Sequence, residues 1–541
     1  MANPPSYSDK RLLIIDDIPD MRSTLRSQIG SLAIDKVAMA GNVREALDHL
    51  RKAKYDIILC DYFLGSGTDG QQFLEFLRSS KLIGRATLFI MVTAETGYES
   101  VITAAECLPD DYLLKPFTAE TLRSRFERLL EKKTRLAVID KLMDQERWPD
   151  IVAACDEIIA AKDKYLVDVM RIKGNALIMS NQFDLARDFY RQALALRSMP
   201  WAKLGMARAL RGLGEVDQAR QLLDDLIAEN PSFLSAYDML GHIHMEAGEG
   251  ERALEVLDSA CTVSPNSLAR HRSIAGIAED VADFSRVEKA LSLVVSKTKN
   301  SPLRNSSDYA KLGNALTQMG EVGKAVALLD EAKISFKEPS DVRLLAAVEA
   351  VAQQKAGNAD LANQALKRAL QRGVEKLPEA TTLAIAKACL ANDMQDEAMA
   401  LLKDVIQNNP ESKAVHGRVS SLMQQHGSEG LSQALIESSV QEIIQLNNSA
   451  VAKAKAGEFT IASQMLSEAA SRLPDNLQIV ANASFCLLLD VFMNKLDSVK
   501  LREAQLLQKS VMEKNNRHPK LADITDLMAK IQAKYKLVPS T

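Results

Sequence analysis

Small residues recur at intervals close to 34 positions along most of this chain of 541 residues. The series consists of eight alanines: Ala153, Ala186, Ala219, Ala253, Ala325, Ala362, Ala398 and Ala462. The first four are separated by 33, 33 and 34 positions. A period of this length is typical of arrays built from pairs of antiparallel helices. Because one such pair cannot bury its apolar face alone, the repeat predicts an all-α solenoid of stacked pairs.

Residues that break helices accompany these alanines at fixed offsets. Six turn residues stand five positions before an alanine: Gly214, Gly248, Gly320, Gly357, Asp393 and Gly457. Four prolines stand twelve positions after one: Pro231, Pro265, Pro410 and Pro474. Three glycines stand twelve positions before one: Gly174, Gly241 and Gly313. The turn residue joins two helices, the proline ends the second helix, and the small residues let the helices approach closely.

These units resemble the tetratricopeptide repeat, whose period is 34 residues. The resemblance covers about 135–475, and the spacing drifts around 267–300 and 411–440. We expect tetratricopeptide-like helical repeats over 132–475 and capping helices over 476–541. The repeat alanines are expected to pack, and the concave surface to bind a protein whose identity the sequence leaves open.

The first 131 residues follow a different pattern, in which short apolar runs alternate with amphipathic stretches. The β-rich runs are Leu12–Ile15, Ile34–Met39, Ile57–Cys60, Leu88–Val92 and Tyr112–Leu114. Between them lie helical stretches such as Asn42–Ala53, with Asn42 placed to cap the helix. The alternation predicts an α/β fold of the flavodoxin-like type, with a five-stranded parallel sheet over 10–131. Residues 1–9 are expected to be disordered.

The join between the two regions contains neither glycine nor proline from 117 to 148. Leucines and a phenylalanine keep helical spacing up to Leu130, and the spacing resumes at Leu136. A continuous helix over 118–147 would span about 45 Å, and a break near 132–134 is equally compatible with the pattern. In either case a flexible linker rich in glycine and serine is absent, so we expect the two regions to keep a defined orientation relative to each other.

Polar residues gather at the ends of the predicted strands. Asp16 and Asp17 follow the first strand, Asp61 the third, Thr93 the fourth and Lys115 the fifth. An open parallel sheet places its ligand site at this edge. Crowded carboxylates repel one another and need a cation, and Mg²⁺ accepts both carboxylate and phosphate oxygens. Asp61 is then a candidate nucleophile for a phosphoryl group, with Lys115 supplying positive charge and Thr93 a hydroxyl.

The motifs IIDD, ILCDYFL, MVTA and LLKPF resemble the response-regulator receiver domain over about 10–131. The separations of 44 residues from Asp17 to Asp61 and 22 from Thr93 to Lys115 are similar to those of that family. The resemblance implies that Asp61 is the phosphoacceptor and that Mg²⁺ is held by Asp17, Asp61 and the backbone carbonyl of Phe63, with Asp16 acting through water.

The same resemblance implies that Thr93 and Tyr112 form a switch pair and that Lys115 contacts the phosphoryl group. Ala94 would leave room for that group. One departure concerns Gly65, because the family usually has proline four residues after the phosphoacceptor. The loop that follows, GSGTDG, is also longer, which leaves its shape open.

Other site classes are disfavoured. The segment Gly65–Gly70 satisfies GxGxxG but follows the third predicted strand, whereas a dinucleotide fold needs this motif in its first βα turn. A phosphatase of the haloacid-dehalogenase type needs DxD after its first strand, which Asp16-Asp17 does not supply. His242 and His244 point in different directions on a helix, so a shared metal is not expected.

Composition and the absence of long apolar runs restrict the expected location and partners of the protein. The net charge of -4 argues against general nucleic-acid binding. The N-terminal segment lacks an apolar signal region, and no apolar run approaches the roughly 20 residues of a membrane span. Six cysteines without a CxxC pattern predict free thiols in a reducing compartment. We therefore expect a cytoplasmic protein without nucleic-acid or membrane partners.

Together these features predict a two-component response regulator that signals through protein contacts of its solenoid. A sensor histidine kinase or a phosphotransfer protein would donate the phosphoryl group, and the solenoid would modulate a kinase or another regulator. The alternative is a constitutive scaffold whose receiver serves docking or dimerisation, and a homodimer stays open. We expect no enzymatic activity beyond Mg²⁺-dependent phosphorylation and dephosphorylation of the receiver itself.

Overall fold

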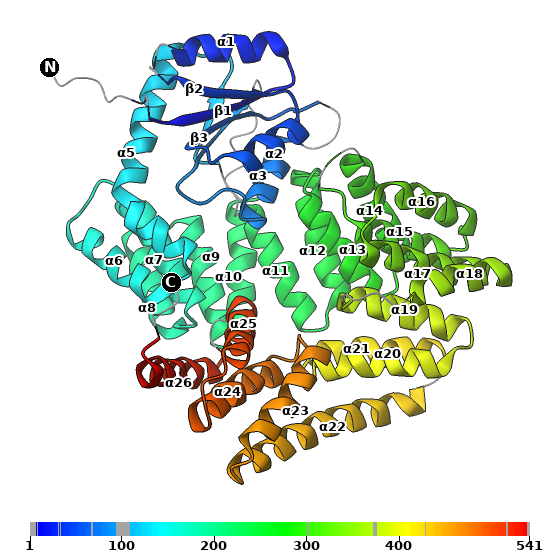
Figure 1. Ribbon diagram of the computed structural model, residues 1–541. Helices are drawn as coiled ribbons and strands as arrows, with labels where there is room; N and C mark the ends of the chain where they lie inside the picture. The colour runs from blue at the N-terminus through cyan, green and yellow to red at the C-terminus, as the bar shows by residue number, and fades with distance from the viewer. Residues whose placement is uncertain are drawn as a thin grey trace. The chain divides into compact units, whose positions relative to one another are not determined.

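A computed structural model describes residues 7–537 except 8, 31, 33, 66–68, 94–108, 300, 302, 372–375, 428 and 516–517. The chain divides into two compact units, Met1–Met319 and Gly320–Thr541. The first unit holds a β-sheet with its helices and the first part of a helical array, and the second unit is helical (Figure 1). Among the described helices, none combines the length and the apolarity needed to cross a membrane.

The five predicted strands form one parallel sheet. They are β1 (Arg11–Ile15), β2 (Lys36–Ala40), β3 (Ile57–Asp61), β4 (Leu88–Thr93) and β5 (Asp111–Leu114). Their order is β2-β1-β3-β4-β5, and every pair is parallel. The flavodoxin-like prediction is therefore confirmed. The second strand begins two residues later than predicted, because its pairing with β1 runs from Lys36 to Ala40, while Ile34 is buried outside the strand.

Helices cover both faces of this sheet, which explains why its strands lack polar alternation. One apolar cluster packs α2 (Val43–Lys52) and α3 (Gly70–Ser79) against one face. The other packs α1 (Pro19–Gly30) and the first half of α5 (Ala119–Asp144) against the opposite face. As predicted, Asn42 caps α2, since its side chain accepts a hydrogen bond from the Glu45 N–H at 3.0 Å.

Helix α5 is continuous over 26 residues, so the break considered near 132–134 does not occur. Its first half contributes Leu122 and Phe126 to the sheet core. Its second half contributes Leu136 and Ile139 to a cluster with the next two helices. The boundary predicted between residues 131 and 132 thus falls inside one helix that serves two cores.

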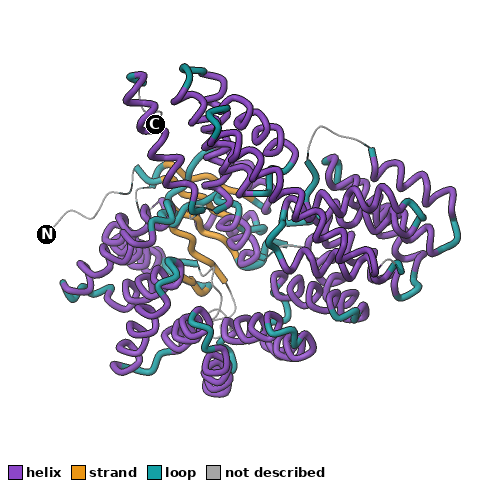
Figure 2. Tube along the Cα trace, turned by 90° about the horizontal axis from the view of Figure 1, so that it is seen from below, coloured by secondary structure: helices purple, strands orange, loops and turns teal. Residues whose placement is uncertain are grey.

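Outside the sheet, the described residues form helices and the turns and loops that join them (Figure 2). The rest of the first unit consists of paired helices. They are α6 (Trp148–Ala160), α7 (Leu166–Met179), α8 (Phe183–Leu196), α9 (Pro200–Gly212), α10 (Val216–Glu229), α11 (Leu234–Glu246), α12 (Gly250–Val263), α13 (Leu268–Asp280), α14 (Phe284–Thr298) and α15 (Ser306–Gln318). The second unit is also built from successive helices joined by short turns. Its helices are α16 (Val322–Ser335), α17 (Pro339–Lys355), α18 (Ala359–Leu370), α19 (Glu379–Ala391), α20 (Gln395–Asn408), α21 (Lys413–Gln425), α22 (Glu429–Lys455), α23 (Phe459–Arg472), α24 (Leu477–Met493), α25 (Ser498–Lys514) and α26 (Lys520–Tyr535).

All six predicted turn residues have left-handed backbones, with φ between 59° at Asp393 and 84° at Gly457. This conformation closes the short turn between two helices and favours glycine. Four further turns between helices use non-glycine residues that the glycine pattern could not reveal, with φ between 51° and 61°: Glu146, Lys162, Asn181 and Ala282. Ala282 lies where the repeat spacing drifts, so a helix pair is present there too.

One repeat assignment is wrong. Ala153 is exposed, whereas the other seven repeat alanines have no exposed surface. The first helix of the array, α6, buries Ile151 and Cys155 against its neighbours, so Ala153 faces away from the core. A second departure is the 27-residue helix α22, which covers the end of one repeat and the start of the next. No proline interrupts this stretch of sequence, which accounts for the drift around 411–440.

Candidate functional site

Three carboxylates meet at the carboxyl edge of the sheet. Asp16 follows β1 and is fully buried, Asp17 is exposed, and Asp61 ends β3 with 8% of its surface exposed. Each offers an oxygen atom, and the three oxygens lie within 4.8 Å of one another. The neighbouring strands β1 and β3 bring them together, as the sequence predicted. A cluster of oxygen donors of this kind fits a hard divalent cation such as Mg²⁺.

Lys115 connects the two buried carboxylates. Its Nζ donates hydrogen bonds to Asp16 Oδ2 at 3.0 Å and to Asp61 Oδ1 at 2.9 Å. Its backbone N–H donates to the Thr93 carbonyl at 2.7 Å, which fixes the residue just beyond β5. Lys115 therefore offsets part of the negative charge of the cluster.

Burial and charge shift two pKa values at this site. Burial raises the pKa of the Asp61 carboxyl, and the charge of Asp16 adds to the rise against the opposing effect of Lys115. Burial alone would lower the pKa of the Lys115 ammonium, but its hydrogen bonds to Asp61 and Asp16 outweigh burial and raise it. Lys115 thus stays charged, and the ionised form of Asp61 is disfavoured without a further cation.

The carboxylate of Asp16 is held on both sides. Its Oδ1 accepts a hydrogen bond from the Ile18 N–H at 2.9 Å, and its Oδ2 accepts the one from Lys115. The Arg22 guanidinium also donates to the Asp16 carbonyl at 2.6 Å, a contact that the sequence analysis did not find. With both oxygens engaged, Asp16 is suited to a water-mediated contact with a cation, whereas Asp17 is open to solvent.

The predicted switch residues lie on neighbouring strands. Thr93 ends β4 with 2% of its surface exposed, and Tyr112 lies on β5. The Tyr112 hydroxyl donates to Gln71 Oε1 on α3 at 3.3 Å. No periodic signal links Gln71 and Tyr112, which are 41 residues apart, so the sequence could not reveal this contact.

Two further predicted site residues lie close to Asp61 or Thr93 in the sequence. Phe63 is 53% exposed. Ala94 lies outside the residues that the structure describes.

The departure from the receiver pattern at Gly65 has a backbone explanation. Gly65 has φ of +82°, in the left-handed region. Proline is locked near −65° and could not adopt this conformation. The start of this loop therefore follows a different path from the one that a proline would set.

Gly70, the first residue of α3, makes a close contact that the sequence analysis missed. A Cβ atom there would lie 2.5 Å from the Asp61 carbonyl oxygen and 2.7 Å from Met91 Sδ. The start of α3 is thus packed directly on the backbone of Asp61. Asp69 and Gln72 close a capping box around this start, and the pattern D-x-x-Q could have revealed that motif in the sequence.

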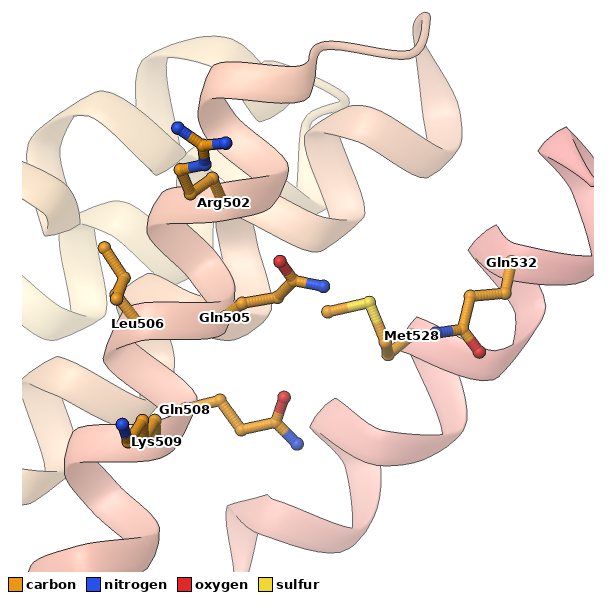
Figure 3. A pocket seen from close by; sticks show the side chains of 7 residues that line it. All are labelled: Arg502, Gln505, Leu506, Gln508, Lys509, Met528 and Gln532. Atoms are coloured by element: carbon orange, nitrogen blue, oxygen red, sulfur yellow. The ribbon is translucent and has the colours of Figure 1, made fainter. Parts of the chain in front are cut away.

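A separate cavity lies between α25 and α26 in the second unit (Figure 3). Its volume is about 380 Å³. Five of its seven lining residues have polar or charged side chains, and the lining consists of Arg502, Gln505, Leu506, Gln508, Lys509, Met528 and Gln532. None of these residues belongs to the acidic cluster, and the lining contains no carboxylate. The cavity is therefore no part of the candidate site.

Comparison with known proteins supports both regions. Residues 12–127 match the response regulator receiver domain model, and residues 177–241 match a tetratricopeptide repeat model. Chemotaxis protein CheY-3 of Vibrio cholerae is 29% identical over 122 residues, which cover 23% of this chain and 92% of that protein. Chemotaxis protein CheY of Pseudomonas aeruginosa is also 29% identical over 122 residues, covering 23% and 97%.

Two solved structures were also similar to parts of the chain. The chemotaxis response regulator CheY4 of Vibrio cholerae is 27% identical, with 22% of this chain and 98% of that one covered and a TM-score of 0.21. A tetratricopeptide repeat protein from Parabacteroides merdae is 14% identical, with 49% and 98% covered and a TM-score of 0.30. The family matches agree with the parallel sheet and the paired helices described above. This chain therefore contains a response regulator receiver domain over residues 12–127, followed by a helical region that includes tetratricopeptide repeats at 177–241.

Proposed function

We propose that this chain is a phosphorylation-controlled regulator in which Asp61 accepts a phosphoryl group and the solenoid delivers the output through protein contacts. One observation carries the proposal. Asp61 ends β3 beside two other carboxylates, with oxygens within 4.8 Å, and lies 2.9 Å from Lys115 Nζ. A nucleophile, a cation site and a fixed positive charge are the parts that phosphoryl transfer requires.

In the proposed reaction, a carboxylate oxygen of Asp61 attacks the phosphorus of a phosphohistidine on a sensor kinase or phosphotransfer protein. The new O–P bond forms as the P–N bond breaks, and the released imidazole takes a proton from solvent. With acetyl phosphate, acetate leaves instead. Mg²⁺, held by Asp17, Asp61 and the Phe63 carbonyl with Asp16 acting through water, would neutralise charge on the transferred group.

The remaining site residues have positioning roles. Lys115 already lies at hydrogen-bond distance from Asp61, so its ammonium is placed to bind an oxygen of the phosphoryl group. The Thr93 hydroxyl, at the end of the neighbouring strand, is a second candidate donor. Hydrolysis by water would return inorganic phosphate and the free carboxylate. We propose no other enzymatic activity.

The proposed output is a changed protein contact of the solenoid, through which the chain competes for a kinase or modulates another regulator. Helix α5 supports this route, because it packs on the receiver core with one half and on the solenoid with the other. A cytoplasmic location belongs to the proposal, since the described cysteines are free thiols that suit a reducing compartment.

Mass measurement after incubation with acetyl phosphate and Mg²⁺ tests the chemistry. We expect the unmodified chain to gain one phosphoryl group and Asp61→Ala to gain none. Asp20→Ala removes an exposed carboxylate on α1 outside the cluster and should still be phosphorylated. Phosphorylation of Asp61→Ala, or none of the unmodified chain, would contradict the assignment.

A capture experiment with the same proteins tests the output. Partners retained by the phosphorylated chain are compared with those retained by Asp61→Ala. Different partner sets are expected for a switch. Identical sets would favour a constitutive scaffold in which the receiver serves only docking or dimerisation.

A further inference from the structure

The cavity between α25 and α26, called the α25–α26 groove below, lies in helices that the sequence predicted only as a cap of the solenoid (Figure 3). Both helices pack mainly on α24 and contact each other little. Of the 17 residues of α25, only Ala504 and Val511 are buried. The groove arises because neither helix covers the facing side of the other. Its volume of about 380 Å³ lies in the usual range of ligand sites.

Two positive charges line this groove with little compensation. Among the residues that the structure describes, Arg502 has no hydrogen bond or ion pair. Lys509 pairs with Glu513 at 3.8 Å, and the two side chains are 73% and 65% exposed. An ion pair of this kind contributes little to binding or stability. Because no carboxylate lines the groove, its charge favours an anionic group.

The surrounding segment carries the same sign of charge. Residues 498–541 contain nine lysines and arginines against four aspartates and glutamates, whereas the whole chain has a net charge of -4. Ion pairs occupy some of these cations, such as Lys500 with Asp490 and Lys514 with Asp475. A local positive charge in an otherwise acidic protein attracts acidic partners to this end of the second unit.

Three glutamines form the uncharged polar part of the lining: Gln505, Gln508 and Gln532. Each amide group offers two N–H donors and a carbonyl acceptor. Gln508 uses one N–H to bond Thr525 Oγ1 on α26 at 3.2 Å. Figure 3 shows Gln505 and Gln508 directed from α25 toward Met528 on α26. Such amides complement the backbone of an extended peptide, whereas a helix already bonds its own backbone groups.

The spacing of the two cations fits an extended peptide. Arg502 and Lys509 are seven positions apart on one face of α25, about 10.5 Å along the helix axis. In the polyproline II conformation, carboxylates three residues apart lie on one face, about 9 Å from each other. Leu506, which is 63% exposed, lies between the two cations in the sequence. An apolar residue between the two acids then has an apolar surface to cover.

We propose that the α25–α26 groove binds an extended acidic segment of a partner protein, in which two carboxylates three residues apart flank an apolar side chain. Arg502 and Lys509 bind the carboxylates, and the glutamine amides bind the peptide backbone. Leu506 and Met528 cover the apolar side chain. The proposal rests on the proposed output through protein contacts, for which it names a partner class, but it requires no phosphoryl group on Asp61.

Fluorescence anisotropy with the full, unphosphorylated chain tests this binding. The probe is the labelled hexapeptide Gly-Glu-Pro-Leu-Glu-Gly, in which proline favours the extended conformation. The labelled control Gly-Gln-Pro-Leu-Gln-Gly lacks only the two charges. We expect the acidic peptide to bind at least about tenfold more tightly than the control, and its affinity to fall as salt is added. Equal affinities, or no binding of the acidic peptide up to about 1 mM, would overturn the proposal.

Charge reversal locates the bound peptide. Arg502→Glu and Lys509→Glu change exposed side chains, so folding should be preserved. Each should weaken binding of the acidic peptide about tenfold, as for the loss of one charge-assisted hydrogen bond. Gln532→Glu, which adds a carboxylate to the α26 side of the groove, should also weaken it. Lys495→Glu makes the same charge change at an exposed position before α25 and should leave the affinity unchanged.

Two outcomes of this comparison would overturn the proposal. An equal loss in Lys495→Glu would mean nonspecific attraction, and unchanged affinity in Arg502→Glu and Lys509→Glu would place the peptide elsewhere. Sedimentation equilibrium of the same proteins tests whether a second copy of this chain covers the groove instead. We expect equal mass for the unmodified chain and Arg502→Glu, and an oligomer that dissociates only in the variant would overturn the peptide assignment. None of these measurements depends on phosphorylation, so their failure would leave the chemistry at Asp61 untouched.

Discussion

Replacing Gly70 with alanine tests whether the start of α3 is packed as tightly on Asp61 as the structure requires. Gly70 has no positive φ, so its backbone accepts alanine and only space opposes the new methyl group. The added Cβ would lie 2.5 Å from the Asp61 carbonyl oxygen, while ordinary contacts begin at 3.4 Å. Either α3 or the end of β3 must therefore move by about 0.9 Å in a close-packed region.

The expected cost follows from two opposing effects. Overpacking of a core costs about 1–3 kcal/mol. Alanine is favoured over glycine in a helix interior by up to about 1 kcal/mol, and by less at the first helical position. We therefore expect Gly70→Ala to destabilise the receiver by about 1–2 kcal/mol, a factor of about 5–30 in the opening equilibrium.

Hydrogen exchange of peptides from β3 and α3 in the full chain measures this change, and calorimetric titration measures Mg²⁺ affinity. Exchange should be faster, and the affinity weaker, because the shift moves the Asp61 and Phe63 groups that would hold the ion. Gly30→Ala is the matched control, since no atom of the described residues lies within 4 Å of a Cβ at this last position of α1. If the two variants behave alike, the close contact between α3 and Asp61 is refuted.

Three further predictions concern the solenoid and the acidic cluster. Gly205→Ala places a Cβ 2.1 Å from the Tyr190 ring and should destabilise the solenoid by about 1–3 kcal/mol in urea unfolding. Gly276→Ala, whose Cβ meets no described atom within 4 Å, should stabilise it by about 0.5–1 kcal/mol, and equal effects would argue against the tight Tyr190 packing. Without Mg²⁺ at pH 7, Asp61→Asn should raise the melting temperature of the receiver, because burial disfavours the ionised carboxylate. The gain in melting temperature should shrink on acidification, because the raised pKa of Asp61 lets the folded state protonate this carboxylate before the unfolded state does. A gain that stays constant with pH would count against a raised pKa of Asp61. Mg²⁺ affinity measured by calorimetry should fall as the pH drops from 7 toward the raised pKa of Asp61, and a flat profile would exclude Asp61 as a ligand.

The continuity of α5 bears on how a signal could travel. A helix that supplies Phe126 to the receiver core and Ile139 to the first helical pair cannot bend freely between them. The contact of Gln72 with Asn266 is a second link between the same two regions. Among the described residues, the receiver is thus joined to the solenoid covalently through α5 and also by a non-covalent hydrogen bond.

Much of the solenoid could be predicted because its rules are local. A turn between adjacent helices needs a left-handed residue, and glycine at Gly214 or Gly248 reports this need directly. The prediction failed at Ala153, where the spacing was right but the helix presents another face to the core. Spacing specifies a period, and only packing against neighbours determines which face is buried.

The sequence by itself determined the two fold classes, the strand ends and the residues that gather there. Parallel strands bring their carboxyl ends to one edge, so Asp16, Asp61 and Lys115 had to meet once the strands were recognised. The tertiary structure alone decided that α5 runs unbroken between two cores and that Gly70 abuts Asp61. It also decided that Gln72 bonds a residue 194 positions away. Such contacts depend on how separately folded elements come together in space, and no period or local propensity in the sequence encodes that distance.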